Sequence, residues 1–300
     1  MSDATGIPGG PGGAEPGAVR ETARRVQGVY FTLLIGNTLA ASFIWGVNTL
    51  FLLDAGLTNL EAFAANAFFS VGMLVFEVPT GVVADTMGRR VSYLLGTLTL
   101  ATTTVLYYLL WVWSAPFWAW ALVSVLLGLG FTFFSGAVEA WLVDALTATG
   151  YEGDLERVFG RGLALSGAAM FVGSLLGGVV AQATDLGVPF LIRAGILVVM
   201  FLVAALVMRD LGFTPAGRAH PVEATEQVMR ASLRYGLGRP SVRYVMFASF
   251  FTTGVGFYVF YALQPYLVQL WGDEDAYTIA GLAAAILSGS QVIGGWLSPW

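Results

Sequence analysis

Apolar residues dominate this chain in eight long runs, and polar residues are concentrated in the segments between them. The runs cover residues 28–53, 62–84, 91–113, 117–143, 162–184, 187–208, 242–271 and 276–300. A helix of about 20 apolar residues crosses the ~30 Å hydrocarbon core of a bilayer, and helices satisfy their own backbone hydrogen bonds in lipid. Eight membrane-spanning helices are therefore predicted. The alternating segments of a membrane β-barrel are absent from the sequence.

The composition points to the same class of protein. The chain is 57% hydrophobic and only 11% charged, whereas soluble domains average about 25% charged residues. It has no cysteine, and its single histidine, His220, lies in a polar stretch. We therefore expect no disulfide, no metal site and no cofactor. The net charge of −5 argues against a nucleic-acid partner.

The N-terminal residues are predicted to form a cytoplasmic tail that covers residues 1–27. Residues 1–19 are rich in glycine, proline and alanine, and such a segment buries too little apolar surface to fold. It lacks the basic and apolar regions of a signal peptide. We expect this tail to be disordered.

The arginines predict the orientation. Thirteen of the fourteen lie in alternate loops, beginning with the N-terminal tail, and the opposite loops carry no arginine. Cytoplasmic loops of membrane proteins are enriched in basic residues, so the N-terminus is predicted to be cytoplasmic. The remaining arginine, Arg193, falls early in the sixth predicted helix. We expect a multi-pass protein of the plasma membrane that works as a monomer.

A longer polar segment, residues 209–241, separates the sixth and seventh runs. Within it, residues 222–237 place Val222, Met229, Leu233 and Leu237 on one helical face. We interpret this stretch as an amphipathic helix on the membrane surface. A solvated linker is the alternative.

Residues 77–90, EVPTGVVADTMGRR, end the second apolar run with closely spaced glycines and charges. The pattern lies between the second and third predicted helices, on the predicted cytoplasmic side. There it resembles a signature motif of the major facilitator superfamily. The matching residues are Gly81, Ala84, Asp85, Gly88, Arg89 and Arg90. Thr86 stands where the family often has a basic residue.

Each residue of this motif also has a physical interpretation. Gly81 would let the second helix approach a neighbour closely, and Gly88 would permit a tight turn. Asp85 is an anion that can accept hydrogen bonds from a facing helix N-terminus or from arginine. The resemblance implies a latch between two helix bundles, and it implies that Asp144 pairs with the motif arginines. A topology anchor without a switching role is the alternative.

The resemblance implies a major facilitator-type helical bundle. Residues 28–208 would form the N-terminal six-helix bundle, residues 209–241 the linker, and residues 242–300 the first two helices of a C-terminal bundle. Family members have twelve helices, so we expect the chain to be a C-terminally truncated form with about eight. In the fifth helix, residues 173–178 (GSLLGG) resemble a glycine-rich motif of drug antiporters, with Ser174 in place of its usual proline. This segment overlaps a stripe of small residues. It also suits close helix packing, and its members are Gly162, Ser166, Ala169, Gly173 and Gly177.

Two glutamates lie inside predicted helices, where ionisable groups are costly and often functional. We expect Glu77 or Glu139 to couple proton uptake to a conformational change; a structural carboxyl group is the alternative. Polar stripes on four helices predict faces that line a shared cavity. Glu77 shares its stripe with Asn66, Ser70 and Met73, and Glu139 shares its stripe with Gly128, Thr132 and Ser135. The other candidate cavity residues are Asn37, Trp45, Asn48, Tyr261 and Gln264.

We expect a secondary active transporter of a small organic solute that works by alternating access. A cavity with aromatic residues and few charges favours proton-coupled efflux of amphipathic, drug-like compounds. Uptake of a sugar or metabolite is one alternative, and a non-transporting scaffold or sensor is another. An enzyme is not expected, because no predicted membrane helix contains a histidine or cysteine to serve as a catalytic base or metal ligand.

Overall fold

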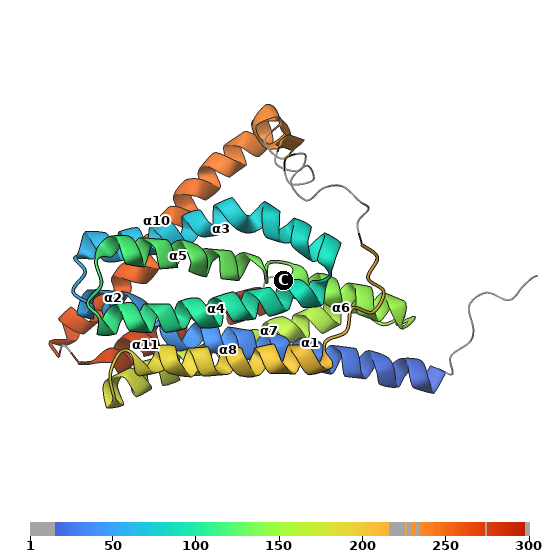
Figure 1. The fold of residues 1–300 in the computed structure, drawn as a ribbon, viewed down its shortest axis with the longest axis horizontal. Helices are drawn as coiled ribbons and strands as arrows, with labels where there is room; N and C mark the ends of the chain where they lie inside the picture. Colours follow the sequence, from blue (N-terminus) through green and yellow to red (C-terminus); the bar gives the residue numbers. More distant parts are fainter. Residues whose placement is uncertain (1–15, 216–225, 227–229, 232–233, 274, 298–300) are drawn as a thin grey trace, which may run out of the picture.

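The computed structural model describes residues 16–215, 226, 230–231, 234–273 and 275–297, and these residues contain helices and no β-strand. The helices are α1 (Pro16–Trp45), α2 (Asn48–Asp54), α3 (Asn59–Met87), α4 (Arg89–Val112), α5 (Phe117–Thr132), α6 (Ala137–Ala148), α7 (Leu155–Ala183), α8 (Val188–Val207), α10 (Pro240–Trp271) and α11 (Tyr277–Leu297) (Figure 1). Seven segments are long and apolar enough to cross a membrane, and α11 contributes a shorter apolar stretch, Tyr277–Ser290. The predicted all-α membrane fold is confirmed.

Helices α1 to α8 pack into one bundle, which we name the first bundle. In it α3 lies against α5, α1 lies against α7 and α8, and α4 lies against α5 and α8. Small residues allow helices in lipid to approach closely. A Cβ atom on Gly177 of α7 would collide with the carbonyl of Phe43 in α1, and one on Gly128 of α5 would collide with the carbonyl of Phe69 in α3. The predicted small-residue stripe of α7 therefore faces α1.

Gly81 has a different environment from the one predicted. A Cβ atom built on it would have no neighbour within 4 Å, so this glycine permits no close helix contact in the structure. The prediction that Gly81 lets its helix approach a neighbour is wrong for this arrangement.

The fourth predicted span is broken between Thr132 and Ala137. Gly136 has φ +68°, a left-handed conformation that glycine adopts without strain. The N–H of Ser135 bonds to the carbonyl three residues earlier, as in a 3₁₀ turn. The prediction of one continuous helical face from Gly128 to Glu139 is therefore wrong, because the break changes the direction of the chain between them.

The N-terminal segment is helical where disorder was predicted. Helix α1 begins at Pro16, so the prediction is wrong for residues 16–27. Ala23 and Val26 recur at helical spacing and are buried in a cluster with Trp141 of α6 and Met208, just after α8. This packing stabilises a segment that lies before the first apolar run. Residues 1–15 lie outside the described residues.

Most of the predicted amphipathic helix, residues 222–237, also lies outside the described residues. Among those that are described, Arg230 forms an ion pair with Glu226, four residues earlier. Both side chains are exposed, and such pairs contribute at most about 1 kcal/mol.

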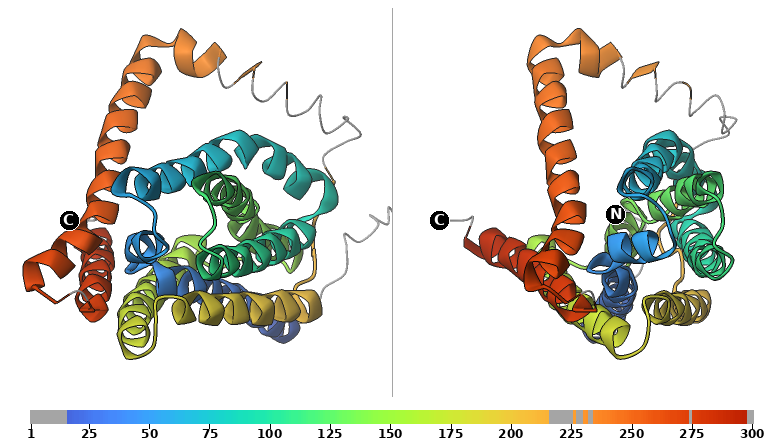
Figure 2. Two further views of the ribbon diagram at one scale, coloured as in Figure 1. Left: turned by 60° about the vertical axis from the view of Figure 1, so that its left-hand side comes forward. Right: turned by 90° about the vertical axis from the view of Figure 1, so that its left-hand side faces the viewer.

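Helix α10 meets the first bundle at one end, whereas α11 lies along one of its helices. Residues 240–259 of α10 are exposed, and this part of the helix stands clear of the bundle in both views of Figure 2. The last third of α10 reaches α2, and α11 packs along α7. There a Cβ atom on Gly281 would lie 2.9 Å from the Cα of Gly178. The contact lies at the predicted outer end, which carries Asp54, Asp185 and Asp273.

Replacing Gly177 with valine should lower the thermal stability of the purified protein. The new side chain would overlap the Phe43 carbonyl and force α1 away from α7, and overpacking of this kind costs about 1–3 kcal/mol. We expect the midpoint of thermal unfolding in detergent to fall by several degrees. Gly195→Ala is the matched control, because a Cβ atom there meets nothing within 4 Å. Equal unfolding temperatures for the two variants would contradict the proposed packing of α1 on α7.

Candidate functional site

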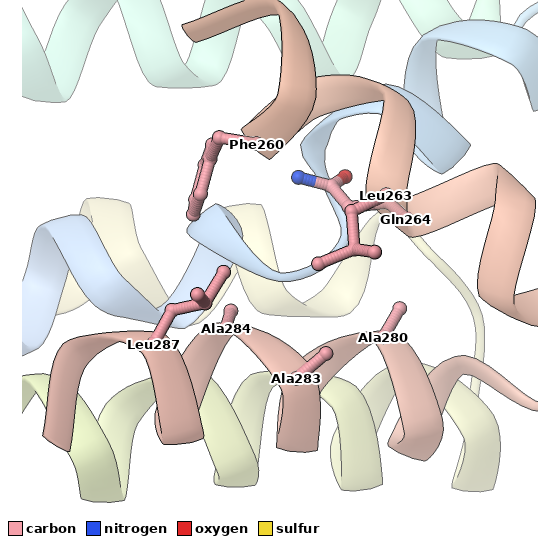
Figure 3. Close-up of a pocket in the computed structure, with 7 residues that line it drawn as sticks. All are labelled: Phe260, Leu263, Gln264, Ala280, Ala283, Ala284 and Leu287. Atoms are coloured by element: carbon pink, nitrogen blue, oxygen red, sulfur yellow. The ribbon is translucent and has the colours of Figure 1, made fainter. Parts of the chain in front are cut away.

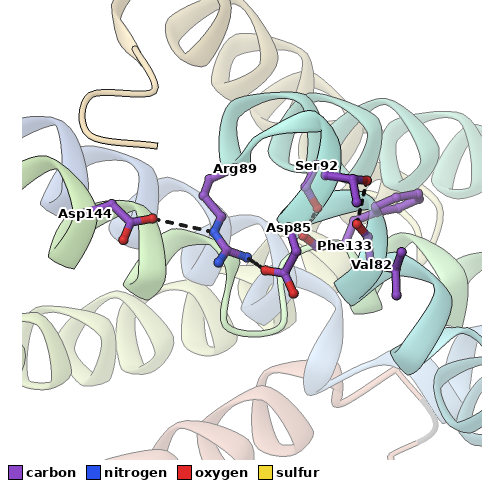
Figure 4. Close-up of polar contacts among 7 residues, drawn as sticks. Val82, Asp85, Arg89, Ser92, Phe133 and Asp144 are labelled. Carbon is purple, nitrogen blue, oxygen red and sulfur yellow. Dashed lines mark hydrogen bonds and ion pairs between the residues drawn. The ribbon is translucent and has the colours of Figure 1, made fainter. Parts of the chain in front are cut away.

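A cluster of charges joins three helices at the predicted cytoplasmic end (Figure 4). Helix α3 ends at Met87, Gly88 has φ +105°, and α4 begins at Arg89. Arg89 Nη1 lies 2.7 Å from Asp85 Oδ1, and Arg89 Nε lies 3.8 Å from Asp144 Oδ2. The second contact is an ion pair without a hydrogen bond. A single guanidinium thus links α3, α4 and α6.

Arg90 faces a different partner from Arg89. Its backbone N–H donates to Asp210 Oδ1 at 2.9 Å, and its Nη2 donates to the carbonyl of Ala205 at 2.6 Å. The first N–H groups of a helix lack partners within it, so Asp210 acts as a cap on α4. A Cβ atom on Gly88 would collide with the same carboxyl group. The chain just after α8 therefore packs against the turn at Gly88, between α3 and α4.

This segment after α8 has a second attachment. Trp141 Nε1 of α6 donates to the carbonyl of Arg209 at 2.7 Å. The pKa of the Asp210 carboxyl is raised by burial, which outweighs the lowering effects of the Arg90 N–H and the nearby arginines. Sequence reasoning missed Asp210. The available signal was an acidic residue directly after the sixth apolar run, within a segment otherwise rich in arginine.

The fold and this cluster agree with a comparison of the chain with protein families. The family model described as Major Facilitator Superfamily matches residues 29–300. The chain belongs to the major facilitator superfamily. It is accordingly a secondary transporter and a multi-pass integral membrane protein, in a family whose members are transporters and generally not enzymes. A comparison with curated proteins gave no match.

The structure brings Asp85, Gly88, Arg89 and Asp144 of this transporter together. It directs Arg90 to Asp210 and Ala205 instead. All of these groups belong to the first bundle or to the chain directly after α8. In this conformation the cluster therefore ties the helices of one bundle to each other, and its predicted role as a latch between bundles remains a prediction.

Glu77 lies on an exposed face of α3. Its Oε1 accepts a hydrogen bond of 2.5 Å from Ser135 Oγ, in the break between α5 and α6. Both residues are exposed among the described residues, so the burial expected for an intramembrane carboxyl group is not present here. Pro79 lies inside the same helix two residues later. Glu77 thus joins two interrupted segments and faces the space beside the first bundle.

Glu139 has a local role that the helix break creates. It is the third residue of α6, in the first turn, where a negative charge stabilises the positive end of the helix dipole. It also lies within electrostatic range of the Tyr30 hydroxyl of α1. This placement favours the structural alternative for Glu139 over proton coupling.

Two of the predicted cavity residues make hydrogen bonds inside the first bundle, and a third packs against α10. Asn37 Oδ1 accepts from the hydroxyl of Tyr93 at 3.0 Å, and Asn48 Nδ2 donates to Asn66 Oδ1 at 2.9 Å. Trp45 packs edge-on against Phe260 of α10. In this conformation these residues hold helices together and do not line an open cavity.

Gln264 of α10 is inserted into the break between α1 and α2. In a continuous helix the N–H of Thr49 would bond to the carbonyl of Trp45. Here Gln264 Nε2 donates to Trp45 O at 2.8 Å, and Gln264 Oε1 accepts from Thr49 N–H at 2.9 Å. The side chain is only 3% exposed. One amide from α10 therefore replaces a hydrogen bond of the first predicted helix.

A small hollow beside Gln264 separates α10 from α11 (Figure 3). It is lined by Phe260, Leu263, Gln264, Ala280, Ala283, Ala284 and Leu287 and has no room for a water molecule. Tyr261 lies on another face of α10, stacked on Phe257. The hollow is a packing gap and not a substrate site.

Arg193 of α8 is a buried cation without an anionic partner. Its side chain is 2% exposed, Nε has no hydrogen-bond partner, and no described residue forms an ion pair with it. Its Cζ lies 5.9 Å from the centre of the Phe131 ring. A cation–π contact contributes about 2 kcal/mol at most, whereas burying an unpaired charge costs several kcal/mol. The described side chains therefore compensate this charge incompletely.

Two substitutions of Asp210 should distinguish the effect of its charge on stability from the effect of its capping hydrogen bond. Asp210→Asn keeps an acceptor for the Arg90 N–H and removes the cost of burying a charge, so its unfolding temperature should equal or exceed that of the unaltered protein. Asp210→Leu leaves the Arg90 N–H without its cap and should lower the free energy of unfolding by about 0.5–2 kcal/mol.

The stability should also depend on pH through Asp210. Because the pKa of Asp210 is raised in the folded protein, its contribution to stability is present at low pH and is lost as pH rises through that pKa. Thermal unfolding at several pH values measures both effects. An Asn variant as unstable as the Leu variant would contradict this assignment.

Proposed function

We propose that this transporter moves a small amphipathic organic solute out of the cell by alternating access, driven by proton entry. The observation that carries the proposal is the asymmetric contact between α10–α11 and the first bundle. Helix α10 meets the first bundle at the predicted outer end through Gln264 and stands clear of the bundle at the other end, while α11 packs along α7. This arrangement suits a state that is closed to the outside and open to the cytoplasm.

The hydrogen bonds that Gln264 makes at the outer contact can be exchanged for others when this contact opens. If Gln264 withdraws, the Thr49 N–H and the Trp45 carbonyl can bond to each other and complete the helix. The same two buried polar groups are then satisfied in both states, so opening leaves neither of them unpaired. Alternating access needs two states of similar free energy, and this exchange of hydrogen bonds helps to provide them.

Glu77 supports the proposal of proton coupling. Its carboxylate is accessible from the space beside α3, and it accepts a hydrogen bond from Ser135 in the break of the fourth span. Protonation would remove its charge and add an O–H donor to a group that otherwise only accepts hydrogen bonds. The contact between α3 and the α5–α6 break would change with it.

Transport by the purified protein in proteoliposomes tests the proposed function. The panel consists of lipophilic cations, aromatic carboxylates and sugars, each with and without a pH gradient. We expect a pH gradient to drive at least one amphipathic compound and no sugar. Asp85→Asn should reduce the rate about tenfold, since it removes the partner of Arg89 at the junction of three helices. Movement of sugars alone would favour uptake of a metabolite, and movement of nothing by folded protein would favour a scaffold.

Glu77→Gln should abolish the dependence of the transport rate on the pH gradient while downhill movement of the solute continues. The amide keeps the size of the side chain and an acceptor for Ser135, but it cannot release a proton. The matched control is Glu152→Gln, which changes an exposed carboxylate in the loop before α7. An unchanged response to the pH gradient in Glu77→Gln would remove this residue from the coupling mechanism.

A further inference from the structure

Arg193 is a feature of the described membrane helices that the proposed transport cycle leaves without a role. Arg89 has two carboxylate neighbours and Arg90 donates to a carbonyl, but Arg193 has neither kind of partner among the described residues. Its Nε is buried and unbonded. A guanidinium in this position offers a free planar set of donors, and carboxylates match that geometry with two parallel hydrogen bonds.

The guanidinium lies between the outer end of α8 and the middle of the membrane. Arg193 is the sixth residue of α8, which begins at Val188, so its Cα lies roughly 8 Å along the helix from that end. Its guanidinium packs on Phe131, which stands fourteen residues after Phe117 at the start of α5, so the side chain extends toward the interior of the ~30 Å hydrocarbon core. Secondary transporters bind their substrates near the membrane midplane.

The neighbours of Arg193 suit an aromatic or apolar body attached to an anion. Tyr107 of α4 lies close enough for an electrostatic interaction, and its hydroxyl is 2.5 Å from Ser124 Oγ. Ser124 in turn donates to the carbonyl of Trp120. The rings of Trp120 and Phe190 flank Tyr107. One strong cation with aromatic surfaces beside it is a favourable combination for an amphipathic anion.

The same group of residues extends toward α10. Tyr107, a neighbour of Arg193, lies within electrostatic range of the Tyr261 hydroxyl of α10. A solute bound beside Tyr107 would therefore lie close to both parts that must move relative to each other during alternating access.

We propose that Arg193 anchors an anion subsite, and that the transported solute is an organic carboxylate whose apolar body lies on Phe131 and Tyr107. The inference rests on the proposed transport function for its biological role, but binding can be measured without transport. The carboxylate supplies the negative charge that no described side chain supplies. The aromatic residues supply the contact area and exclude water.

Matched ligands test the subsite in the purified full chain. The probes are 2-naphthoate and decanoate, each compared with its neutral amide, and binding is measured by calorimetry in a neutral detergent. We expect at least one carboxylate to bind about tenfold or more tightly than its amide. Arg193→Gln should abolish this preference, and Arg193→Lys should keep part of it, since lysine retains the charge but not the planar pair of donors. Arg161→Gln, which changes an exposed arginine of α7, should leave the preference intact.

Every outcome has a defined meaning. Equal affinity of the unaltered protein for carboxylates and amides overturns the proposal, and so does a preference that survives in Arg193→Gln. If Arg193→Gln fails to fold, the comparison of ligands on the unaltered protein and on Arg193→Lys still decides the question. Binding through Arg193 without movement in proteoliposomes would keep the subsite and overturn the transport proposal. Transport of neutral solutes without any preference for carboxylates would keep the transport proposal and overturn the subsite.

Discussion

The arrangement of this transporter depends on a hydrogen bond that the first predicted helix does not make. Between Trp45 and Thr49 the helical ladder is open, and the amide of Gln264 occupies the gap. Unpaired buried polar groups cost about 1–3 kcal/mol each, so the break is tolerable only because α10 supplies both a donor and an acceptor. The Gln264 side chain therefore does two things at once: it joins α10 to the first bundle, and it stabilises the break in the first span.

The opposite end of the first bundle is held by interactions within that bundle. Arg89 joins α3, α4 and α6, and Asp210 caps α4 from the chain that follows α8. These contacts favour motion of the bundle as a single body. In such a body a change at the predicted outer end would alter its orientation relative to α10, while its internal helix contacts would persist. The closely packed glycines between α1 and α7 support the same behaviour.

Much of the fold could be predicted from the sequence, because long apolar runs and the positions of arginines reflect the physics of the bilayer directly. The grouping of Asp85, Arg89 and Asp144 followed from the motif and its placement. The helix breaks at Gly46–Val47 and at residues 133–136 could not be predicted in the same way. Glycine is common within membrane helices, and only the contact with a distant residue, such as Gln264, decides which glycine interrupts one. Asp210 was missed for a related reason, since a cap supplied from another part of the chain has no local pattern.

The most direct test of the account is the distance between the outer ends of α3 and α10 when Gln264 is replaced by leucine. The chain has no native cysteine, so spin labels can be placed at Leu60→Cys and Leu270→Cys alone; these positions are 80% and 69% exposed. Pulsed electron resonance in lipid nanodiscs gives the distance distribution. Gln269→Leu is the control, because it makes the same chemical change on an exposed face of α10. The account predicts a single short distance in the unaltered protein and the control, and a shift to longer distances in Gln264→Leu. An unchanged distribution in Gln264→Leu would contradict the claim that this amide holds the outer end closed.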